Sequence, residues 1–278
     1  MKKYRIHKLG IETEKLPFSE ITPDFLDDYE EYMLYSGKSI TTVGIYLRPL
    51  RAIFNIAISE NDVHPDLYPF GKRKYQIPQG KKVKKALSQR ELSLLYKIDP
   101  RIPEQEKARD FWFFSYACNG MNMKDIALLK YEDFEDDAFY YYRAKTFKKS
   151  KQKEKIKIYL TPFVESVIDK YGNSKKNSYV FPIINDAMTA TEQHKKIKNF
   201  TRLVNQHISN LAEENGLPAE ISTYWARHSF ATNAVRKGAS MEFISEALNH
   251  SDLKVTKGYF AGFEDEAKKE FAQNLMDF

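Results

Sequence analysis

The sequence has only one cysteine, Cys118, among its 278 residues, which excludes an internal disulfide framework. Because this cysteine lies in an apolar run, we expect a buried, reduced thiol. No run of about 18 apolar residues occurs, so no membrane span is expected, and the charged N-terminus lacks the apolar segment of a signal peptide. Closely spaced metal-binding pairs of histidine, cysteine or aspartate are also lacking. These absences predict a cytoplasmic protein and give no indication of a metal site.

The residues that are present are typical of a globular protein with a sizeable core. Hydrophobic residues make up 42% and charged residues 29% of the chain, with 19 phenylalanines and 18 tyrosines to fill the interior. A length of 278 residues favours two domains. The formal net charge of +6 is modest, but the basic residues are unevenly placed, which matters more for binding than the total.

A segment near the C-terminus carries the residues with the most distinctive chemistry. Tyr224, Arg227 and His228 have the i, i+3, i+4 spacing that places them on one face of a helix. His250 and Tyr259 follow a second expected helix. An arginine can bind a phosphate bidentately, a histidine can hydrogen-bond a non-bridging oxygen, and a phenol can attack phosphorus. Any one of these residues alone would be read as an ordinary polar residue of a helix, so the joint spacing carries the inference.

That spacing resembles the C-terminal signature of the tyrosine recombinase (phage-type integrase) family. The resemblance extends more weakly back to about residue 20. The sequence as a whole most resembles integrases carried by mobile elements of Bacteroides-type bacteria. It implies a mainly α fold with a small antiparallel β-sheet: an N-terminal helical, SAM-like core-binding domain plus an α+β catalytic domain. The matching residues are Ala226-Arg227-His228-Ser229-Phe230-Ala231-Thr232, Leu248-Asn249-His250-Ser251-Asp252 and Thr256-Lys257-Gly258-Tyr259.

Helix-start signals and composition divide the chain. Thr22-Pro23 and Ser39 are expected to begin two amphipathic helices, and Ser88 with Glu91 forms a capping box. Members of the family often have a further arm-binding domain ahead of this point. The expected parts are an N-terminal segment (1–20), a helical core DNA-binding domain (21–70), a basic linker (71–86) and a catalytic domain (87–278) that ends in a C-terminal helix (264–278).

Two groups of residues are expected to contact DNA. In the first domain, four polar residues lie off the apolar stripe and are either phosphate contacts, as the family implies, or a solvated helix face. In the linker, basic residues without acids suit a phosphate backbone, the alternative being a merely solubilising segment. The residues are Thr41, Thr42, Arg48 and Arg51, and then Lys72, Arg73, Lys74, Lys81, Lys82, Lys84 and Lys85.

A basic β-hairpin is expected in the catalytic domain. Residues 139–146 and 155–160 are β-prone, and the family places a mobile catalytic lysine in this hairpin. Lys145 fits best and Lys148 is the alternative. Alternation along a strand would place Arg143 and Lys145 on the same face.

The sequence departs from the family at two positions. Asn122, followed by the acidic Asp125, stands where the first arginine is expected. Tyr224 stands where many members have histidine or lysine, and its phenol brings no charge near neutral pH. Arg143 is our candidate for the missing cation, the alternative being that its stem merely packs on the sheet.

The resemblance implies an enzyme that cuts and rejoins double-stranded DNA at recombination sites through a 3′-phosphotyrosine. Tyr259 would be the nucleophile and Arg227 the transition-state cation. His250 would bind the phosphate or assist the tyrosine proton, and Lys145 would be the general acid. Neither ATP nor a metal is needed. The family also implies a homo-tetramer on DNA through the C-terminal helix, in a nucleoid-associated bacterial protein. A type IB topoisomerase-like enzyme and a catalytically weakened DNA-binding regulator are the alternatives.

Overall fold

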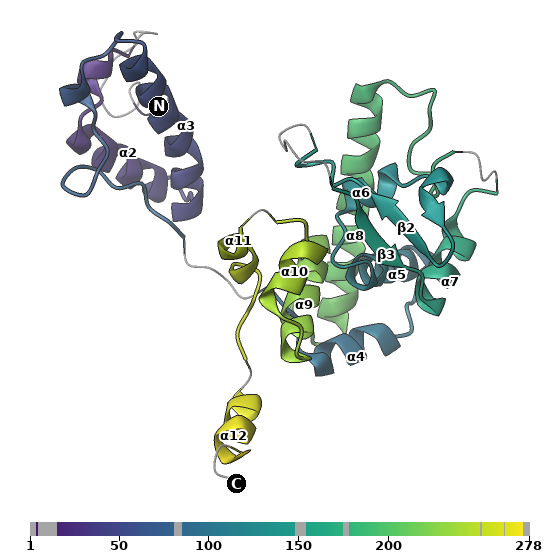
Figure 1. Cartoon of the computed structure of the whole chain (residues 1–278). Coiled ribbons are helices and arrows are strands. Elements are labelled where there is room, and N and C mark those ends of the chain that lie inside the picture. Colours follow the sequence, from purple (N-terminus) through teal and green to yellow (C-terminus); the bar gives the residue numbers. More distant parts are fainter. Residues whose placement is uncertain are drawn as a thin grey trace. The chain divides into compact units, whose positions relative to one another are not determined.

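The computed structural model describes Tyr4 and residues 16–80, 85–147, 154–174, 178–250, 252–263 and 265–274. The chain forms two compact units, residues 1–83 and 84–278 (Figure 1). It is mostly helical, with one three-stranded antiparallel sheet in the second unit. None of the described helices combines the length and apolar character that crossing a bilayer requires.

The first unit is built on two helices that begin where their capping residues predict. In α2 (Pro23–Tyr35), Thr22 accepts a hydrogen bond from the Phe25 amide, and in α3 (Ile40–Ser59), Ser39 accepts one from Thr42. The expected apolar stripes pack between the helices. The short 3-10 helices η1 (Phe18–Glu20) and η2 (Pro65–Leu67) complete this unit. Its buried core includes Leu26, Tyr29, Met33, Val43, Leu47 and Phe54.

The packed part of this unit extends past residue 70, where the linker was expected to begin. Phe70 and Tyr75 form an isolated bridge, and both side chains are buried in the core of the unit. The Tyr75 hydroxyl also donates to Glu30 at 2.5 Å. The dense positive charge of the linker predicted an unpacked segment. The burial of Phe70 and Tyr75 instead holds residues 71–75 against the first unit. Lys81, Lys82 and Lys84 lie outside the described residues.

The second unit surrounds the helix α5 (Pro103–Ala117), which packs on α8, α9 and α7. Its buried cluster includes Phe111, Trp112, Phe114 and the expected buried thiol, Cys118. The other elements are α4 (Gln89–Lys97), α6 (Met123–Leu128), η3 (Tyr131–Asp133), β1 (Phe134–Glu135), β2 (Ala138–Tyr141), β3 (Ile156–Tyr159), α7 (Pro162–Tyr171), α8 (Ala190–Glu214), α9 (Thr223–Arg236), α10 (Met241–Ala247), α11 (Leu253–Lys257) and α12 (Asp265–Asn274).

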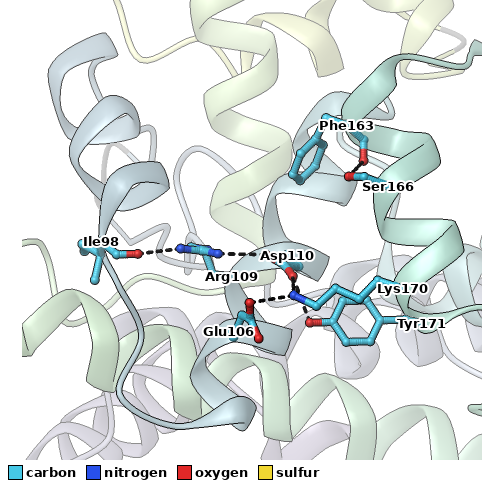
Figure 2. A network of polar contacts seen from close by, with 8 residues as sticks. All are labelled: Ile98, Glu106, Arg109, Asp110, Phe163, Ser166, Lys170 and Tyr171. Atoms are coloured by element: carbon cyan, nitrogen blue, oxygen red, sulfur yellow. Dashed lines mark hydrogen bonds and ion pairs between the residues drawn. The ribbon is translucent and has the colours of Figure 1, made fainter.

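A polar network ties α5 to α7 at the edge of this core. Figure 2 shows the side chains of Lys170 and Tyr171 directed at Asp110, each 2.9 Å from its Oδ2 atom. Lys170 also pairs with Glu106 at 2.7 Å, and Arg109 donates to the Ile98 carbonyl. Burial and the hydrogen bond to Asp110 raise the pKa of Tyr171 to about 12, so the phenol stays a donor at neutral pH.

The sheet has the order β1-β2-β3, with Phe139 opposite Ile158 and Tyr141 opposite Ile156. The expected strand over residues 139–146 is shorter in the structure and ends at Tyr141. The amides of Thr146 and Phe147 both donate to the Arg143 carbonyl, which turns the chain. Arg143 is therefore buried and Lys145 exposed, so the expectation that they share a strand face is wrong.

Candidate active site

Tyr259 follows α11 and is held by its main chain. Its amide donates to the Thr256 carbonyl at 2.9 Å. Its own carbonyl accepts from Thr232 Oγ1 at 3.2 Å and from His228 Nδ1 at 3.2 Å. His228 and Thr232 are one helical turn apart on α9, so two residues of the R-H-S-F-A-T motif fix the backbone that carries the phenol.

The phenol of Tyr259 lies against a second phenol. The Tyr224 hydroxyl donates to the Tyr259 hydroxyl at 2.7 Å. Burial would raise the pKa of Tyr259, but the hydrogen bond from Tyr224 and the charges of Arg227 and Arg143 outweigh it, and the pKa is lowered. Burial and the hydrogen bond to Tyr259 instead raise the pKa of Tyr224. The two phenols therefore divide the roles, with Tyr259 the more readily ionised.

Arg227 is almost completely enclosed, with 1% of its surface exposed. Its Nη1 atom donates to the Gly120 carbonyl at 3.0 Å and its Nη2 atom to the Leu248 carbonyl at 2.7 Å. Gly120 has φ of +67°, and a Cβ atom there would lie 2.6 Å from the Arg227 Cα atom. Glycine is thus required both for the backbone conformation and for the close approach of the arginine.

Arg143 joins Arg227 at the same carbonyl group. It is 7% exposed, and its Nη1 atom donates to the carbonyls of Leu248 at 3.3 Å and Asn249 at 3.5 Å. The Nε atoms of both arginines are buried without a hydrogen-bond partner among the described residues. Burial and the neighbouring Arg143 lower the pKa of Arg227. Two guanidinium groups with unused donors therefore converge at one point, which favours an anionic ligand.

His250 completes this cluster. Its Nε2 atom lies 3.4 Å from Arg227 Nη2, and its Nδ1 atom lies 3.0 Å from Thr256 Oγ1. Its main chain is fixed by Ser245, whose carbonyl accepts from the His250 amide and whose hydroxyl donates to the His250 carbonyl. Burial, and then the charges of Arg227, Arg143 and Lys145, lower the pKa of His250 to about 4. The imidazole is therefore neutral at physiological pH.

Lys145 is exposed beside this cluster, on a turn held by α6. Asp125 Oδ1 accepts from the Ala144 amide at 2.9 Å, and the Asn122 side chain donates to Asp125 Oδ2 at 3.4 Å. Burial raises the pKa of Asp125, although the hydrogen bonds from Ala144 and Asn122 oppose the shift. Asn122 thus supports the acid that positions the lysine turn. Lys148 lies outside the described residues.

The residues expected to contact DNA are mostly exposed in the structure. Thr41, Arg48 and Arg51 are exposed on α3, whereas the Thr42 hydroxyl lies 2.9 Å from Ser39 Oγ at the helix start. Lys72, Arg73 and Lys85 are exposed. Lys74 is also exposed, but its ammonium donates to the Tyr68 carbonyl at 2.5 Å. The structure thus gives Lys74 a local partner that its charge alone did not reveal.

Two threonines of the site were not assigned a role from the sequence. Thr232 and Thr256 both belong to the motifs around Arg227 and Tyr259, but the sequence alone does not show which groups their hydroxyls contact. Their almost complete burial, at 0% and 1% exposure, is the signal that a polar partner must exist. No group of three or more His, Cys, Asp or Glu side chains among the described residues is arranged to hold a metal ion.

A phenol with a lowered pKa beside two buried guanidinium groups, with a neutral imidazole and an exposed lysine, has the groups that phosphoryl transfer through a covalent tyrosine uses. Residues 85–266 match the phage integrase family and residues 1–77 match the phage integrase SAM-like domain. The chain therefore belongs to the phage integrase family.

Relatives with similar sequences are named as tyrosine recombinases. The chain is 26% identical over 263 residues to tyrosine recombinase XerD of Rickettsia bellii. This alignment covers 88% of this chain and 81% of that protein. It is 24% identical to XerA of Thermococcus kodakarensis, over 81% of this chain and 71% of that protein.

Solved structures share the fold at low identity. The Tn1549 transposon integrase, in complex with circular intermediate DNA, superposes with a TM-score of 0.61 at 18% identity, over 95% of this chain and 89% of that chain. A lambda integrase dimer bound to a core site gives 0.62 at 16% identity, over 93% of this chain and 86% of that chain.

Proposed function

We propose that this protein is a site-specific DNA recombinase, or integrase, that cleaves and rejoins DNA strands through a 3′-phosphotyrosyl intermediate. The observation that carries the proposal is the phenol of Tyr259, with its lowered pKa, beside the buried guanidinium groups of Arg227 and Arg143. Membership of the phage integrase family and similarity to tyrosine recombinases support it. The bond energy is kept in the phosphotyrosyl ester, so the reaction requires no ATP.

The two arginines act as the phosphate clamp. Among the described residues, Arg227 and Arg143 each have an Nε donor without a partner, and both donate to the Leu248 carbonyl. The two guanidinium groups therefore lie close enough together to serve one phosphate. Arg143 thereby supplies the positive charge that Asn122 cannot. The geometry supports this over the alternative that its stem only packs on the sheet, because its guanidinium reaches α10 through Leu248.

The remaining residues handle protons and hydrogen bonds. Lys145 gives a proton to the leaving 5′-oxygen as general acid. Tyr224 donates a hydrogen bond to the oxygen of Tyr259 and so stabilises the attacking phenolate and, in the reverse step, the departing one. His250, whose Nε2 atom lies 3.4 Å from Arg227 Nη2, hydrogen-bonds the phosphate or assists the Tyr259 proton.

DNA binding extends to the first unit and the connector. Exposed Arg48, Arg51 and Thr41 on α3 supply phosphate contacts, with Thr42 at the start of the helix. The basic residues from Lys72 to Lys85 follow the backbone without reading sequence.

Assembly and origin follow the family in our proposal. We expect a homo-tetramer on DNA, with the C-terminal helix of each subunit docked on a neighbour. We also expect a bacterial, nucleoid-associated protein encoded by a mobile element of the Bacteroides type. The likeness to a transposon integrase supports the mobile-element origin. The molecular mass of the protein–DNA complex in solution tests the tetramer.

Covalent trapping tests the proposal. Nicked duplexes that tile the DNA flanking the protein's own gene are incubated with the protein, and adducts resistant to denaturant are detected. Wild-type protein should form a 3′-linked adduct, and Tyr259→Phe should bind the same DNA without forming one, because only the phenol oxygen is removed. An adduct that persists in this variant would place the nucleophile elsewhere.

Covalent trapping, together with assays of DNA relaxation and strand exchange, separates the two alternatives. A catalytically weakened DNA-binding protein would form no adduct on any duplex. A type IB topoisomerase-like enzyme would form the adduct and relax supercoiled DNA as a monomer, without exchanging strands between two duplexes.

A further inference from the structure

The proton of the Tyr259 phenol needs an acceptor when the oxygen attacks phosphorus. Around this phenol, Arg227, Arg143 and Lys145 are cations and have no lone pair to offer. Tyr224 already donates to the Tyr259 oxygen and is the less acidic of the two phenols. A neutral histidine is the remaining kind of acceptor.

Two histidines contact the Tyr259 ring, and their contacts separate them. His228 uses its Nδ1 atom for the Tyr259 main-chain carbonyl, and its ring lies 4.6 Å from the phenol ring, centroid to centroid. It therefore holds the backbone. His250 instead directs Nε2 at Arg227, and its ring stacks on the phenol ring of Tyr259 with 5.1 Å between the centroids.

The partners of His250 determine which nitrogen carries its proton. Arg227 Nη2 can only donate, so Nε2 at 3.4 Å must present a lone pair to it. A neutral imidazole has one N–H group, which must then be at Nδ1, and it points at Thr256 Oγ1 at 3.0 Å. The opposite tautomer would set two donors against each other at Arg227. Thr256 is 1% exposed, so its oxygen is available to His250 without competition from bulk water.

We propose that Thr256 is a positioning residue that fixes His250 as the Nδ1–H tautomer, so that His250 Nε2 accepts the proton of Tyr259. This inference rests on the proposed recombinase function. In cleavage, Arg227 Nη2 turns from His250 Nε2 to the phosphate and frees the lone pair of that nitrogen. The Tyr259 oxygen then bonds to phosphorus while its proton passes to Nε2. The bond between phosphorus and the 5′-oxygen breaks, and that oxygen takes a proton from the Lys145 ammonium. Rejoining returns both protons by the reverse path.

Thr256 also links the acceptor to the nucleophile. Its side chain contacts His250, and its carbonyl accepts the Tyr259 amide at 2.9 Å. The short helix α11 therefore sets the imidazole and the phenol relative to each other. Serine at this position keeps the oxygen, whereas valine keeps the shape and removes it, which gives a matched pair of variants.

The tautomer is measured directly in the DNA-free protein. The full chain is labelled with ¹⁵N-histidine, its six histidines are resolved in long-range proton–nitrogen NMR spectra, and His250 is assigned by His250→Asn. We expect wild-type protein and Thr256→Ser to show His250 protonated at Nδ1. Thr256→Val should populate the Nε2–H form. Wild-type His250 protonated at Nε2 would overturn the proposal.

Cleavage kinetics test the consequence. On the nicked duplex found by covalent trapping, Thr256→Val should lower the single-turnover rate by about 10- to 100-fold, as loss of a group that orients a functional histidine does. Thr256→Ser should stay close to wild type. Chemical denaturation of each variant confirms that it is folded.

A substrate with sulfur in place of the 5′-bridging oxygen distinguishes protonation of the leaving group from deprotonation of the Tyr259 phenol. A thiolate leaves without a proton, so this substrate should restore cleavage by Lys145→Ala but leave Thr256→Val slow. Restoration of Thr256→Val by sulfur, or unimpaired cleavage of the ordinary substrate by this variant, would reject the acceptor role. Absence of any adduct with wild-type protein would reject the recombinase function itself, a result separate from the NMR measurement.

Discussion

Replacing Arg143 should separate activity from stability. Its Nη1 atom and Arg227 Nη2 bond the same Leu248 oxygen at 3.3 and 2.7 Å, so these nitrogens cannot be more than about 6 Å apart. Two unit charges at that distance repel by about 3 kcal/mol at an effective dielectric constant of about 20. Against this repulsion stand two hydrogen bonds to carbonyls at 3.3 and 3.5 Å, each worth about 1.5 kcal/mol when the donor is charged.

These opposing contributions nearly cancel in the free protein. Arg143→Met should therefore change the free energy of unfolding by less than about 1 kcal/mol. Arg227→Met should cost more, because the Gly120 carbonyl loses its guanidinium donor inside the protein. Cleavage should respond differently, since each arginine is a preorganised cation for the phosphate. Loss of either should slow cleavage by about 10²–10³.

The assay pairs urea denaturation with single-turnover cleavage of a nicked duplex. Asn122→Ala is the comparison variant and should slow cleavage less than tenfold, because Asn122 acts through Asp125. Arg143→Lys keeps a charge without the planar fork and should recover only part of the rate. Near-normal cleavage by Arg143→Met, with DNA binding intact, would refute the clamp. A severe loss in Asn122→Ala would instead give the amide a direct role.

Three further predictions concern pH and packing. Cleavage should be nearly constant from about pH 6 to 8 and fall below about pH 5, where His250 with its pKa of about 4 begins to charge. Because this pKa is lower in the folded than in the unfolded state, the free energy of unfolding should also fall by up to about 3 kcal/mol from about pH 6.5 to 4. His250→Gln should lack this fall, and an equal fall in that variant would contradict the assignment. Asp110→Ala should lower the free energy of unfolding by about 1.5–3 kcal/mol through loss of the Lys170 and Tyr171 hydrogen bonds, measured by urea titration, with Asp110→Asn less affected. Gly120→Ala should destabilise by more than about 2 kcal/mol and slow cleavage, whereas Gly238→Ala, at φ of +92° with nothing within 4 Å, should cost only about 1 kcal/mol in thermal or urea unfolding.

Local signals in the sequence were sufficient for helix starts and for the shared face of α9. The capping residues Thr22, Ser39 and Ser88 all accept the expected amide hydrogen bonds, because a cap depends on neighbours within one turn. Tyr224 and Arg227 face the phenol together because helical spacing fixes their direction.

Contacts between distant elements set the features that the sequence did not reveal. The β2 strand stops at Tyr141 and the chain turns, with Asp125 of α6 holding the Ala144 amide, a contact that strand periodicity cannot anticipate. Arg143 is consequently buried by the turn and Lys145 is exposed. The proton position on His250 likewise depends on a side chain six residues away and on another helix.

The main-chain anchoring of Tyr259 has a mechanical consequence. Once a DNA strand is esterified to the phenol, any pull on that strand is transmitted to a carbonyl that Thr232 and His228 hold on α9. The amide on the other side of the same residue is tied to α11 through Thr256. Swinging Tyr259 to carry the attached strand to a new partner would break these main-chain hydrogen bonds. Under the proposed function, the free 5′-end is therefore the part that travels, and base pairing with the incoming strand would guide exchange.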